Sequence, residues 1–323
     1  YNYRTYPNLT GLFGMIDVEE HDADMGFSVQ CAFDLMEWSS KPHGVFAQRK
    51  NLVRGKFWRM LDDIVRFNRH SERLLEETDD RMGLGEVLDR EGAGEGFKQW
   101  YFVPMASAIW STRPMDMLDF PAQTFLRFMD NHGLLQIIGH PDWKSVVGGS
   151  RNYVNALAGD VSGEIRTGAP VNRVARESGR VVVESATGES AYDAVVIGTH
   201  PGTTLGMLGD ADDEEREILS AFKYQSNPTC VHCDERFLPT ATRAHAAWND
   251  FAETGRIDSD HLSVTYYLHT LQELGTEHPV LVTLNPLVSP AAEDVFFEID
   301  YEHPVFDRPA IVAQRRIPDI QGR

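Results

Sequence analysis

Two cysteines lie three positions apart, in the sequence Cys230-Val231-His232-Cys233, which is a spacing used by metal and redox pairs. The flanking residues predict a strand over 229–234, and successive side chains of a strand point to opposite faces. Cys230 and Cys233 would then point away from each other, so they could not bind one metal ion. The sequence holds no second C-x-x-C. We therefore predict two strand cysteines that are neither bridged nor metal-bound.

The glycine-rich stretch REGAGEGF, residues 90–97, invites comparison with loops that bind phosphate. It follows a predicted helix rather than a strand, and Glu91 and Glu95 place negative charge beside its glycines. A phosphate-binding loop needs backbone N–H groups at a helix N-terminus without adjacent negative charge. The pattern therefore favours a turn between two helices.

The twelve histidines form neither HExxH nor HxH, so they predict no metal site. His200 is distinctive because it follows the apolar run 194–198. That run predicts a buried strand over 193–199, which ends in the turn Thr199-His200-Pro201. Ligands of open α/β sheets gather at the carboxyl ends of strands. We expect the backbone of this turn, rather than the imidazole, to serve a ligand.

A basic segment over 49–70 stands out in an otherwise acidic chain. One interpretation is peripheral contact with an anionic membrane or an acidic partner. The alternative, which we favour, is a helix surface with i,i+4 pairs between Arg59 and Asp63 and between Asp62 and Arg66. The cations of the segment are Arg49, Lys50, Arg54, Lys56, Arg59, Arg66 and Arg69.

Composition bounds the class of protein. The chain has 323 residues, 42% of them hydrophobic, which allows a sizeable core in one large or two medium domains. Its formal net charge of -19 disfavours nucleic acid as a partner. Three cysteines indicate a reducing compartment, for which we expect the cytoplasm. No apolar run is long enough to predict a membrane-spanning helix, and no signal peptide is evident.

The elements that would position these residues come in blocks. Residues 45–132 are predicted to be mostly helical, with a helix over 56–70 that buries Phe57, Leu61, Ile64 and Asn68. Beyond residue 141, three or four strands are predicted over 164–199, with turns at 178–179 and 187–188. A helix over 212–223 and strands around 229–234, 261–271 and 279–286 follow. The sequence therefore predicts an α/β protein of the mixed α+β kind.

The order of several segments resembles the flavin-containing amine oxidase superfamily. Within it, the chain is most similar to bacterial predicted NAD/FAD-binding flavoproteins related to phytoene desaturase and protoporphyrinogen oxidase. It also resembles the flavin-like domain fused to some plant cyclopropane fatty acid synthases. The segments that carry the likeness are RTYPNL, RFNRH, MASAIWS, LDFPAQTFLRFMDNHGLL, VVGGSRNYVNALA, RTGAPVNRVARESGRVVVESATGESAYDAVVIGTHP, DERFLP, SVTYYLHTLQ, VTLNP and HPVFD.

The resemblance implies two domains. A partial, Rossmann-like FAD-binding domain is expected over 1–24 and 141–215. A substrate domain with a mixed or antiparallel sheet and a helical block is expected over 25–140 and 216–310. Residues 311–323 are expected to begin the return to the FAD domain.

The resemblance also raises the question of the FAD pyrophosphate. The family binds it with a strand, a GxGxxG loop and a helix, and the sequence holds no GxGxxG. We therefore expect this unit to precede Tyr1, and the family's C-terminal flavin-contacting segment to follow residue 323. The chain as printed is then a truncated one, which should hold FAD weakly or not at all.

The resemblance implies residues near the cofactor. Lys144 is a weak counterpart of the lysine that lies near the flavin in many amine oxidases, and no catalytic residue is identified. The expected cofactor-binding residues are Tyr1, Asn2, Gly148, Gly149, Val171, Thr199, His200 and Pro201.

The segment 100–135 is rich in large apolar side chains, more than a single helix face needs. Related flavoproteins hold apolar substrates in a cavity beside the flavin, which implies such a cavity here. The expected substrate-pocket residues are Met105, Trp110, Phe128 and His132.

Two functions follow as hypotheses. The first is an FAD-dependent oxidoreductase, of the amine oxidase or desaturase kind, that acts on a largely apolar, lipid-like small molecule. The alternative is a non-catalytic fragment or apo scaffold that binds lipid or a protein partner without redox turnover. A metal hydrolase lacks its ligand cluster. The sequence identifies neither the substrate nor the electron acceptor nor the oligomeric state.

Overall fold

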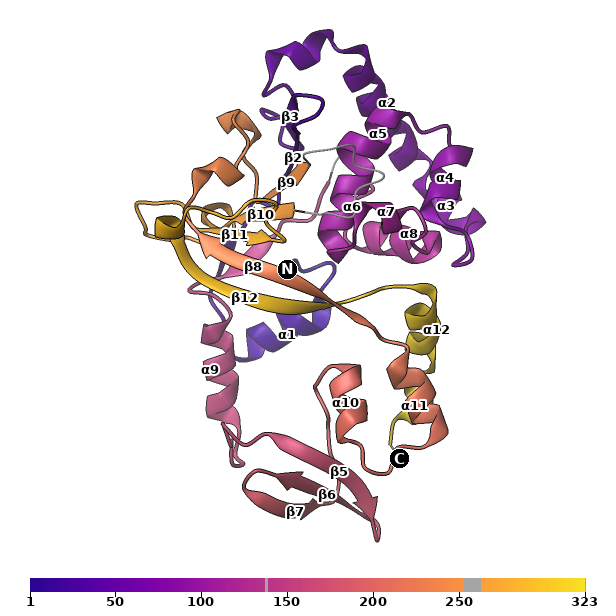
Figure 1. Ribbon diagram of the computed structural model, residues 1–323, viewed down its shortest axis with the longest axis vertical. Coiled ribbons are helices and arrows are strands. Elements are labelled where there is room, and N and C mark those ends of the chain that lie inside the picture. Colours follow the sequence, from indigo (N-terminus) through magenta and orange to yellow (C-terminus); the bar gives the residue numbers. More distant parts are fainter. Residues whose placement is uncertain (137–138, 253–262, 323) are drawn as a thin grey trace. The chain divides into compact units, whose positions relative to one another are not determined.

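The computed structural model describes residues 1–136, 139–252 and 263–322. The chain forms two compact units (Figure 1). Unit 1 consists of residues 1–157 and 226–303, and unit 2 of residues 158–225 and 304–323. Helices and mixed sheets make this a mixed α/β fold, as the sequence predicts.

A seven-stranded mixed sheet forms the centre of unit 1, with the strand order β12-β8-β11-β10-β9-β2-β3. Strands β2 and β9 run parallel, whereas β2–β3, β9–β10, β10–β11 and β11–β8 are antiparallel pairs. Its strands are β2 (Phe27–Cys31), β3 (Met36–Ser39), β8 (Tyr224–His232), β9 (Trp248–Ala252), β10 (Ser263–Tyr267), β11 (Leu281–Leu284) and β12 (Val295–Pro304).

A helical block fills the chain between β3 and β4, on one side of unit 1 (Figure 1). Its core is aromatic: the ring centroids of Phe102 and Phe125 lie 4.9 Å apart, and those of Trp110 and Phe125 lie 5.2 Å apart. Each such buried ring contributes on the order of 2 kcal/mol. The helices are α2 (Gly55–Arg69), α3 (Ser71–Glu77), α4 (Leu84–Arg90), α5 (Glu95–Phe97), α6 (Val103–Trp110), α7 (Pro114–Met117) and α8 (Ala122–Asn131).

Shorter elements complete unit 1. Strands β1 (Glu20–Asp22) and β4 (Lys144–Val146) form an antiparallel pair. Helix α1 (Pro7–Met15) precedes β1, and α9 (Arg151–Asp160) follows β4 and runs across the boundary between the units. The single-turn elements are the π-helix η2 (Lys98–Phe102) and the 3₁₀ helices η1 (Arg49–Val53), η3 (Glu235–Phe237), η4 (Thr242–Ala244), η5 (Leu268–Thr270) and η6 (Ala292–Asp294).

Unit 2 has a three-stranded antiparallel sheet, β5-β6-β7, and a set of helices. Ser178 and Gly179 both have positive φ, which is what the two-residue turn between β5 and β6 requires. Its elements are β5 (Val171–Glu177), β6 (Arg180–Ser185), β7 (Gly188–Tyr192), α10 (Pro201–Met207), α11 (Asp213–Ser220), α12 (Arg308–Arg316) and the 3₁₀ helix η7 (Ile317–Ile320).

The predicted buried strand over 193–199 is wrong for the described chain. Residues 194–198 form no strand, and Val196 is 98% exposed. A strand needs a neighbour that accepts its backbone hydrogen bonds. The free edge of β5 instead meets the residues after α10, where the Gly209 backbone N–H donates to the Val174 carbonyl oxygen at 2.9 Å.

Most local predictions are confirmed. The glycine-rich stretch is a turn between α4 and α5, with Gly92 at φ 64°. The strand predicted over 229–234 is confirmed only as far as His232: Cys230 is buried in β8, but Cys233 lies beyond the end of the strand, so the prediction that both cysteines belong to it is wrong. All three cysteines are free. The predicted apolar stripe of α2 is wrong except at Phe57: the buried side chains are Phe57, Met60, Asp63 and Phe67.

Asp63 lies on the buried stripe of α2 because it holds the glycine-rich turn in place. Its side chain is 1% exposed, and its Oδ2 accepts a hydrogen bond from the Gly94 backbone N–H at 2.9 Å. Arg66 pairs with its Oδ1 at 2.5 Å, and Arg59 pairs with its Oδ2 at 3.5 Å. One carboxylate therefore joins α2 to the start of α5.

We predict that Asp63→Ala lowers the free energy of unfolding of unit 1 by about 1–3 kcal/mol, because the partly buried Gly94 N–H loses its acceptor. Asp62→Ala, at the exposed neighbouring carboxylate, should change it little. Urea unfolding of both variants measures the difference. Equal effects of the two substitutions would contradict the role given to Asp63.

A row of buried polar side chains crosses the seven-stranded sheet. The Ser28 hydroxyl donates to Asn249 Oδ1 at 2.7 Å, and the Thr265 and Thr283 hydroxyl oxygens lie 2.8 Å apart. His232 Nε2 lies 2.7 Å from Thr283 Oγ1, while the Asp234 backbone N–H donates to His232 Nδ1. Because Nδ1 accepts a hydrogen bond, Nε2 carries the proton of the neutral ring.

Burial lowers the pKa of His232, against the opposing effect of Asp234 and Asp294. The unfolded chain therefore binds a proton at this residue before the folded chain does. We predict that unit 1 loses stability as the pH falls below about 6.5, the ordinary histidine value. This loss should be smaller in His232→Gln, whereas His43→Gln, at an exposed histidine, should behave as wild type. Urea unfolding at a series of pH values measures the loss, and no difference between the variants would refute the assignment.

Candidate functional site

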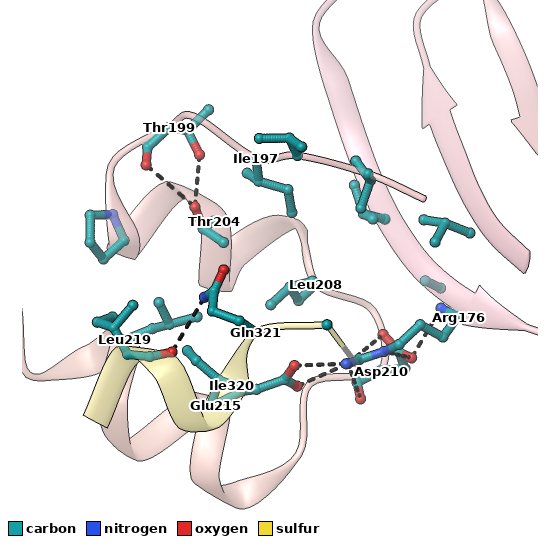
Figure 2. A pocket seen from close by; sticks show the side chains of 18 residues that line it. Arg176, Ile197, Thr199, Thr204, Leu208, Asp210, Glu215, Leu219, Ile320 and Gln321 are labelled. Carbon is teal, nitrogen blue, oxygen red and sulfur yellow. Dashed lines mark hydrogen bonds and ion pairs between the residues drawn. The ribbon is translucent and has the colours of Figure 1, made fainter. Parts of the chain in front are cut away.

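A pocket of about 380 Å³ lies within unit 2 (Figure 2). It is formed by β5 and β6, by the segment before α10, by α10 and α11, and by the C-terminal η7. The lining residues are Val174, Ala175, Arg176, Val181, Val195, Val196, Ile197, Thr199, Pro201, Thr204, Leu208, Asp210, Glu215, Leu219, Ile317, Ile320, Gln321 and Gly322.

Most of the pocket wall is apolar. Aliphatic side chains come from every contributing segment, among them Ile197, Leu208 and Ile320, which Figure 2 shows around the cavity. Thr199 and Thr204 form a small polar edge, with their hydroxyl oxygens 2.9 Å apart. Such a wall suits a flat or aliphatic group that leaves water on binding.

One corner of the pocket is charged. Arg176 Nη1 lies 2.7 Å from Glu215 Oε1, and Arg176 Nε lies 2.8 Å from Asp210 Oδ2. Hydrogen bonds from Arg176 hold the pKa of both carboxyls below their ordinary values, and the same bonds raise the pKa of Arg176. Glu215 also accepts a hydrogen bond from the Asp212 backbone N–H and completes the capping box of α11.

This corner limits which group the pocket can hold. Arg176 is the cation among the lining residues, and two carboxylates already pair with it. A phosphate would meet the net negative charge of the corner, whereas a neutral ring would meet the apolar wall. The described pocket therefore fits the adenine ring of a dinucleotide better than its pyrophosphate.

The structure brings two of the residues predicted near the cofactor into this pocket. Thr199 and Pro201 line it, at the start of α10. His200 is not among the lining residues, and its ring stacks on Tyr224 with the centroids 4.3 Å apart. Val171 begins β5 as predicted and is part exposed, but it does not line the pocket either.

The other predicted cofactor residues lie in unit 1, around β1 and β4. The Tyr1 amino group donates to the Lys144 carbonyl oxygen at 3.0 Å. Asn2 is buried, and its Oδ1 accepts from the Thr5 backbone N–H. Gly148 and Gly149 follow β4 with φ of 73° and 82°, values that glycine adopts without strain.

Lys144 makes ion pairs with its neighbours. Its Nζ lies 2.7 Å from Asp22 Oδ1 and 3.7 Å from Glu20 Oε1. The hydrogen bond to Asp22 is the main reason that its pKa is raised. An ammonium held in this way keeps its proton, so it is poorly suited to act as a base.

Three of the predicted substrate-pocket residues are in contact. The rings of Trp110 and Phe128 have centroids 4.6 Å apart, and Phe128 stacks on His132 at 3.8 Å. His132 Nε2 lies 3.3 Å from the Tyr6 hydroxyl. Met105 is buried in α6. Trp110, Phe128 and His132 form a contiguous aromatic cluster, whereas the pocket described above lies within unit 2.

Sequence reasoning missed the charged corner and the C-terminal wall of the pocket. Glu215 falls in the first turn of the helix predicted over 212–223 and Asp210 lies just before it, but their partner Arg176 stands more than thirty positions earlier. Ile320 and Gln321 fall in the segment assigned to a return to the FAD domain, and they do lie in unit 2 with 158–215. Residues 1–24 and 141–157 belong to unit 1. The division into FAD-binding and substrate domains stays a prediction.

The described part of the chain holds no cluster of three His, Cys, Asp or Glu side chains arranged to bind a metal ion. None of its helices is long and apolar enough to cross a bilayer.

Comparison with solved structures shows the same fold in several proteins of low sequence identity. The CLA-producing fatty acid isomerase from P. acnes matches with a TM-score of 0.65 and 12% identity, over 99% of this chain and 78% of its own. Wild-type putrescine oxidase bound to putrescine matches with a TM-score of 0.58 and 9% identity, over 86% of this chain and 62% of its own. The putative protoporphyrinogen oxidase from Exiguobacterium sp. 255-15 matches with a TM-score of 0.56 and 17% identity, over 88% of this chain and 64% of its own.

Comparison of sequences identifies the family. No curated protein sequence matches the chain significantly. The sequence profile described as "Flavin containing amine oxidoreductase" matches residues 17–233, about two thirds of the chain. The three solved structures have low sequence identity and support the fold alone, in agreement with the profile. The chain therefore belongs to the family of flavin containing amine oxidoreductases.

Proposed function

We propose that this protein is an FAD-dependent oxidoreductase that acts on a largely apolar, lipid-like substrate. The observation that carries the proposal is the family match over 17–233, together with a fold shared with a putrescine oxidase and a putative protoporphyrinogen oxidase. FAD, when bound, supplies the redox chemistry, and the protein supplies binding, orientation and a dry environment. The free cysteines suit the cytoplasm, which is part of the same proposal.

The proposed contacts to the adenine end of FAD lie in unit 2. The apolar wall and Thr199 and Pro201 would surround the adenine ring, and the strand that begins at Val171 would lie near it. Tyr1, Asn2, Gly148 and Gly149 of unit 1 stay predictions from the family resemblance. His200, stacked on Tyr224, would fix the conformation of the turn rather than touch the cofactor.

The apolar substrate is supported by the aromatic cluster in unit 1. Met105, Trp110, Phe128 and His132 include no carboxylate, which is the group expected to bind a cationic amine. Among proteins of the same fold, one acts on fatty acids according to its title and another binds putrescine, so the fold alone selects neither. The chemistry of the four side chains favours the apolar ligand.

A non-catalytic scaffold is the second candidate. It is favoured by the charged corner of the pocket, where Arg176 is already paired and offers a pyrophosphate no free cation. A scaffold of this kind would bind lipid or a protein partner in the same fold without flavin.

We predict that the protein purified from its complete reading frame shows the visible absorption bands of bound flavin. We also predict that Val196→Asp weakens FAD binding at least roughly tenfold, because it places a charge against the apolar wall beside the adenine ring. Val196 is almost fully exposed, so the substitution should leave the fold intact. Titration of FAD, followed by flavin fluorescence, measures the dissociation constant.

Val312→Asp is the matched control, since Val312 is exposed on α12 of the same unit and does not line the pocket. It should bind FAD as the wild type does. If the purified protein carries no flavin, the scaffold replaces the oxidoreductase as the function. If both variants bind FAD equally well, the pocket is not part of the cofactor site.

A further inference from the structure

The basic segment 49–70 divides into two parts with different chemistry. In its second half, two of the three arginines pair with acids of the same helix: Arg59 pairs with Asp63, and Arg66 pairs with both Asp62 and Asp63, whereas Arg69 is exposed and forms no ion pair with the described residues. In its first half, Arg49 and Lys50 are exposed, and neither forms an ion pair with the described residues. The favoured helix-surface interpretation therefore holds for the second half only.

The charge pattern around this first half is exceptional for the chain. The protein has 49 acidic residues among 323, yet none lies between Glu37 and Asp62. That interval contains six cations: Lys41, Arg49, Lys50, Arg54, Lys56 and Arg59. Three of these cations pair with acids from outside the interval: Lys41 with Asp24, Lys56 with Asp34 and Arg59 with Asp63. Arg49 and Lys50 are exposed and form no ion pair with the described residues, on a molecule whose formal net charge is -19.

Three apolar side chains are exposed beside the two unpaired cations. Val53 is 85% exposed, and Leu52 and Trp58 are each 49% exposed. The Trp58 indole N–H donates to the Leu52 carbonyl oxygen at 2.9 Å, which keeps these residues adjacent. We call the surface formed by Arg49, Lys50, Leu52, Val53 and Trp58 the Val53 tip. It lies between β3 and α2, at the extremity of unit 1 in Figure 1.

The backbone beneath the Val53 tip is held firmly. Asn51, in the middle of η1, is fully buried, and its Nδ2 donates to the Glu37 carbonyl oxygen at 3.0 Å. Arg54 donates to the Asp34 carbonyl oxygen at 3.1 Å. Exposed apolar side chains on an anchored turn lose little conformational entropy on binding, so they are prepared for a partner.

We propose that the Val53 tip docks this protein on the surface of an anionic lipid bilayer. Leu52, Val53 and Trp58 would enter the boundary between headgroups and acyl chains, and Arg49 and Lys50 would contact lipid phosphates. Tryptophan suits that depth because its ring is apolar and its N–H is polar. The proposal does not depend on whether the protein binds FAD.

Two observations favour a bilayer over other anionic partners. Nucleic acid would have to approach a protein with a large net negative charge through only two unpaired cations, without the aromatic stacking platform that single strands use. An acidic protein partner would pair with the cations but would leave Val53, the most exposed of the three apolar side chains, without a defined pocket. An anionic bilayer can pair its phosphates with the cations and also bury the apolar side chains of the Val53 tip.

Co-sedimentation with vesicles tests the proposal. One set contains equal parts of phosphatidylcholine and phosphatidylglycerol, and the other contains phosphatidylcholine alone. We expect the full chain to bind the anionic vesicles and to bind the neutral ones much more weakly. Leu52→Ser with Val53→Ser should lower the partition coefficient at least roughly tenfold. Arg49→Glu with Lys50→Glu should lower it at least roughly twentyfold, because each cation near the surface contributes about fivefold.

A matched pair of charge reversals serves as the control. Arg69→Glu with Arg151→Glu changes the net charge by the same amount, and both arginines are exposed and form no ion pair with the described residues. This double variant should bind the anionic vesicles nearly as well as the wild type. Brominated acyl chains in the vesicles should quench tryptophan fluorescence, and Trp58→Phe should remove most of that quenching.

Each other outcome overturns the proposal. Equal binding of the wild type to neutral and anionic vesicles, or no binding to either, would exclude docking through headgroup charge. Equal losses of vesicle binding in the two charge-reversal variants would indicate that binding depends on the net charge of the protein rather than on the Val53 tip. A loss on charge reversal with no loss in the double serine variant would indicate adsorption without insertion, as expected of a surface made for an acidic protein.

Discussion

Unit 1 depends on the parallel pairing of β2 with β9, which joins residues 27–31 to residues 248–252. Closing so long a loop costs conformational entropy, although that cost grows only slowly with loop length. The pairing is reinforced where the Ser28 hydroxyl donates to Asn249 Oδ1 between the two strands. The helical block follows β3 in the chain and ends before β4, and its helix α6 packs Ala108 against Val264, Trp248 and Tyr266 of the same sheet. Sheet closure and helix packing therefore support each other.

Elements whose cause lies within a few residues could be predicted from the sequence. Pro121 and Gly133 mark the two ends of α8, the pair 178–179 makes the hairpin turn, and the acidic first turn marks the start of α11. In each case the determinant is the conformational preference of one or two residues or a cap. The mixed α/β class follows from the order of such elements, and the structure agrees with it.

Features that depend on distant partners could not be predicted in the same way. Asp63 breaks the apolar pattern of α2 because Gly94, about thirty residues later, needs its carboxylate. Residues 194–198 have the composition of a buried strand, but whether they form one depends on a neighbouring strand, which composition does not specify. The residues of the pocket likewise divide into those that local sequence places and those that depend on distant partners. Thr199 and Pro201 could be placed because they end an apolar run and begin a helix, whereas Arg176 acquires its role only from Asp210 and Glu215.

A dinucleotide site must bind both a neutral adenine ring and charged phosphates, and the pocket, with its charged corner, suits only the first. Arg176 with Asp210 and Glu215 carries a net charge of minus one, and the strong pairing keeps both carboxyls ionised to lower pH than usual. An anion placed there would lose its hydration and gain no unpaired donor from the guanidinium, so the free energy of binding an anion is unfavourable. A neutral ring would lose little hydration and gain contact with the aliphatic wall.

In a flavin-binding family, such a pocket is compatible with the adenine end of the cofactor only if backbone N–H groups elsewhere bind the phosphates. The position of the phosphates, rather than that of the adenine, is therefore the stronger test of where FAD binds.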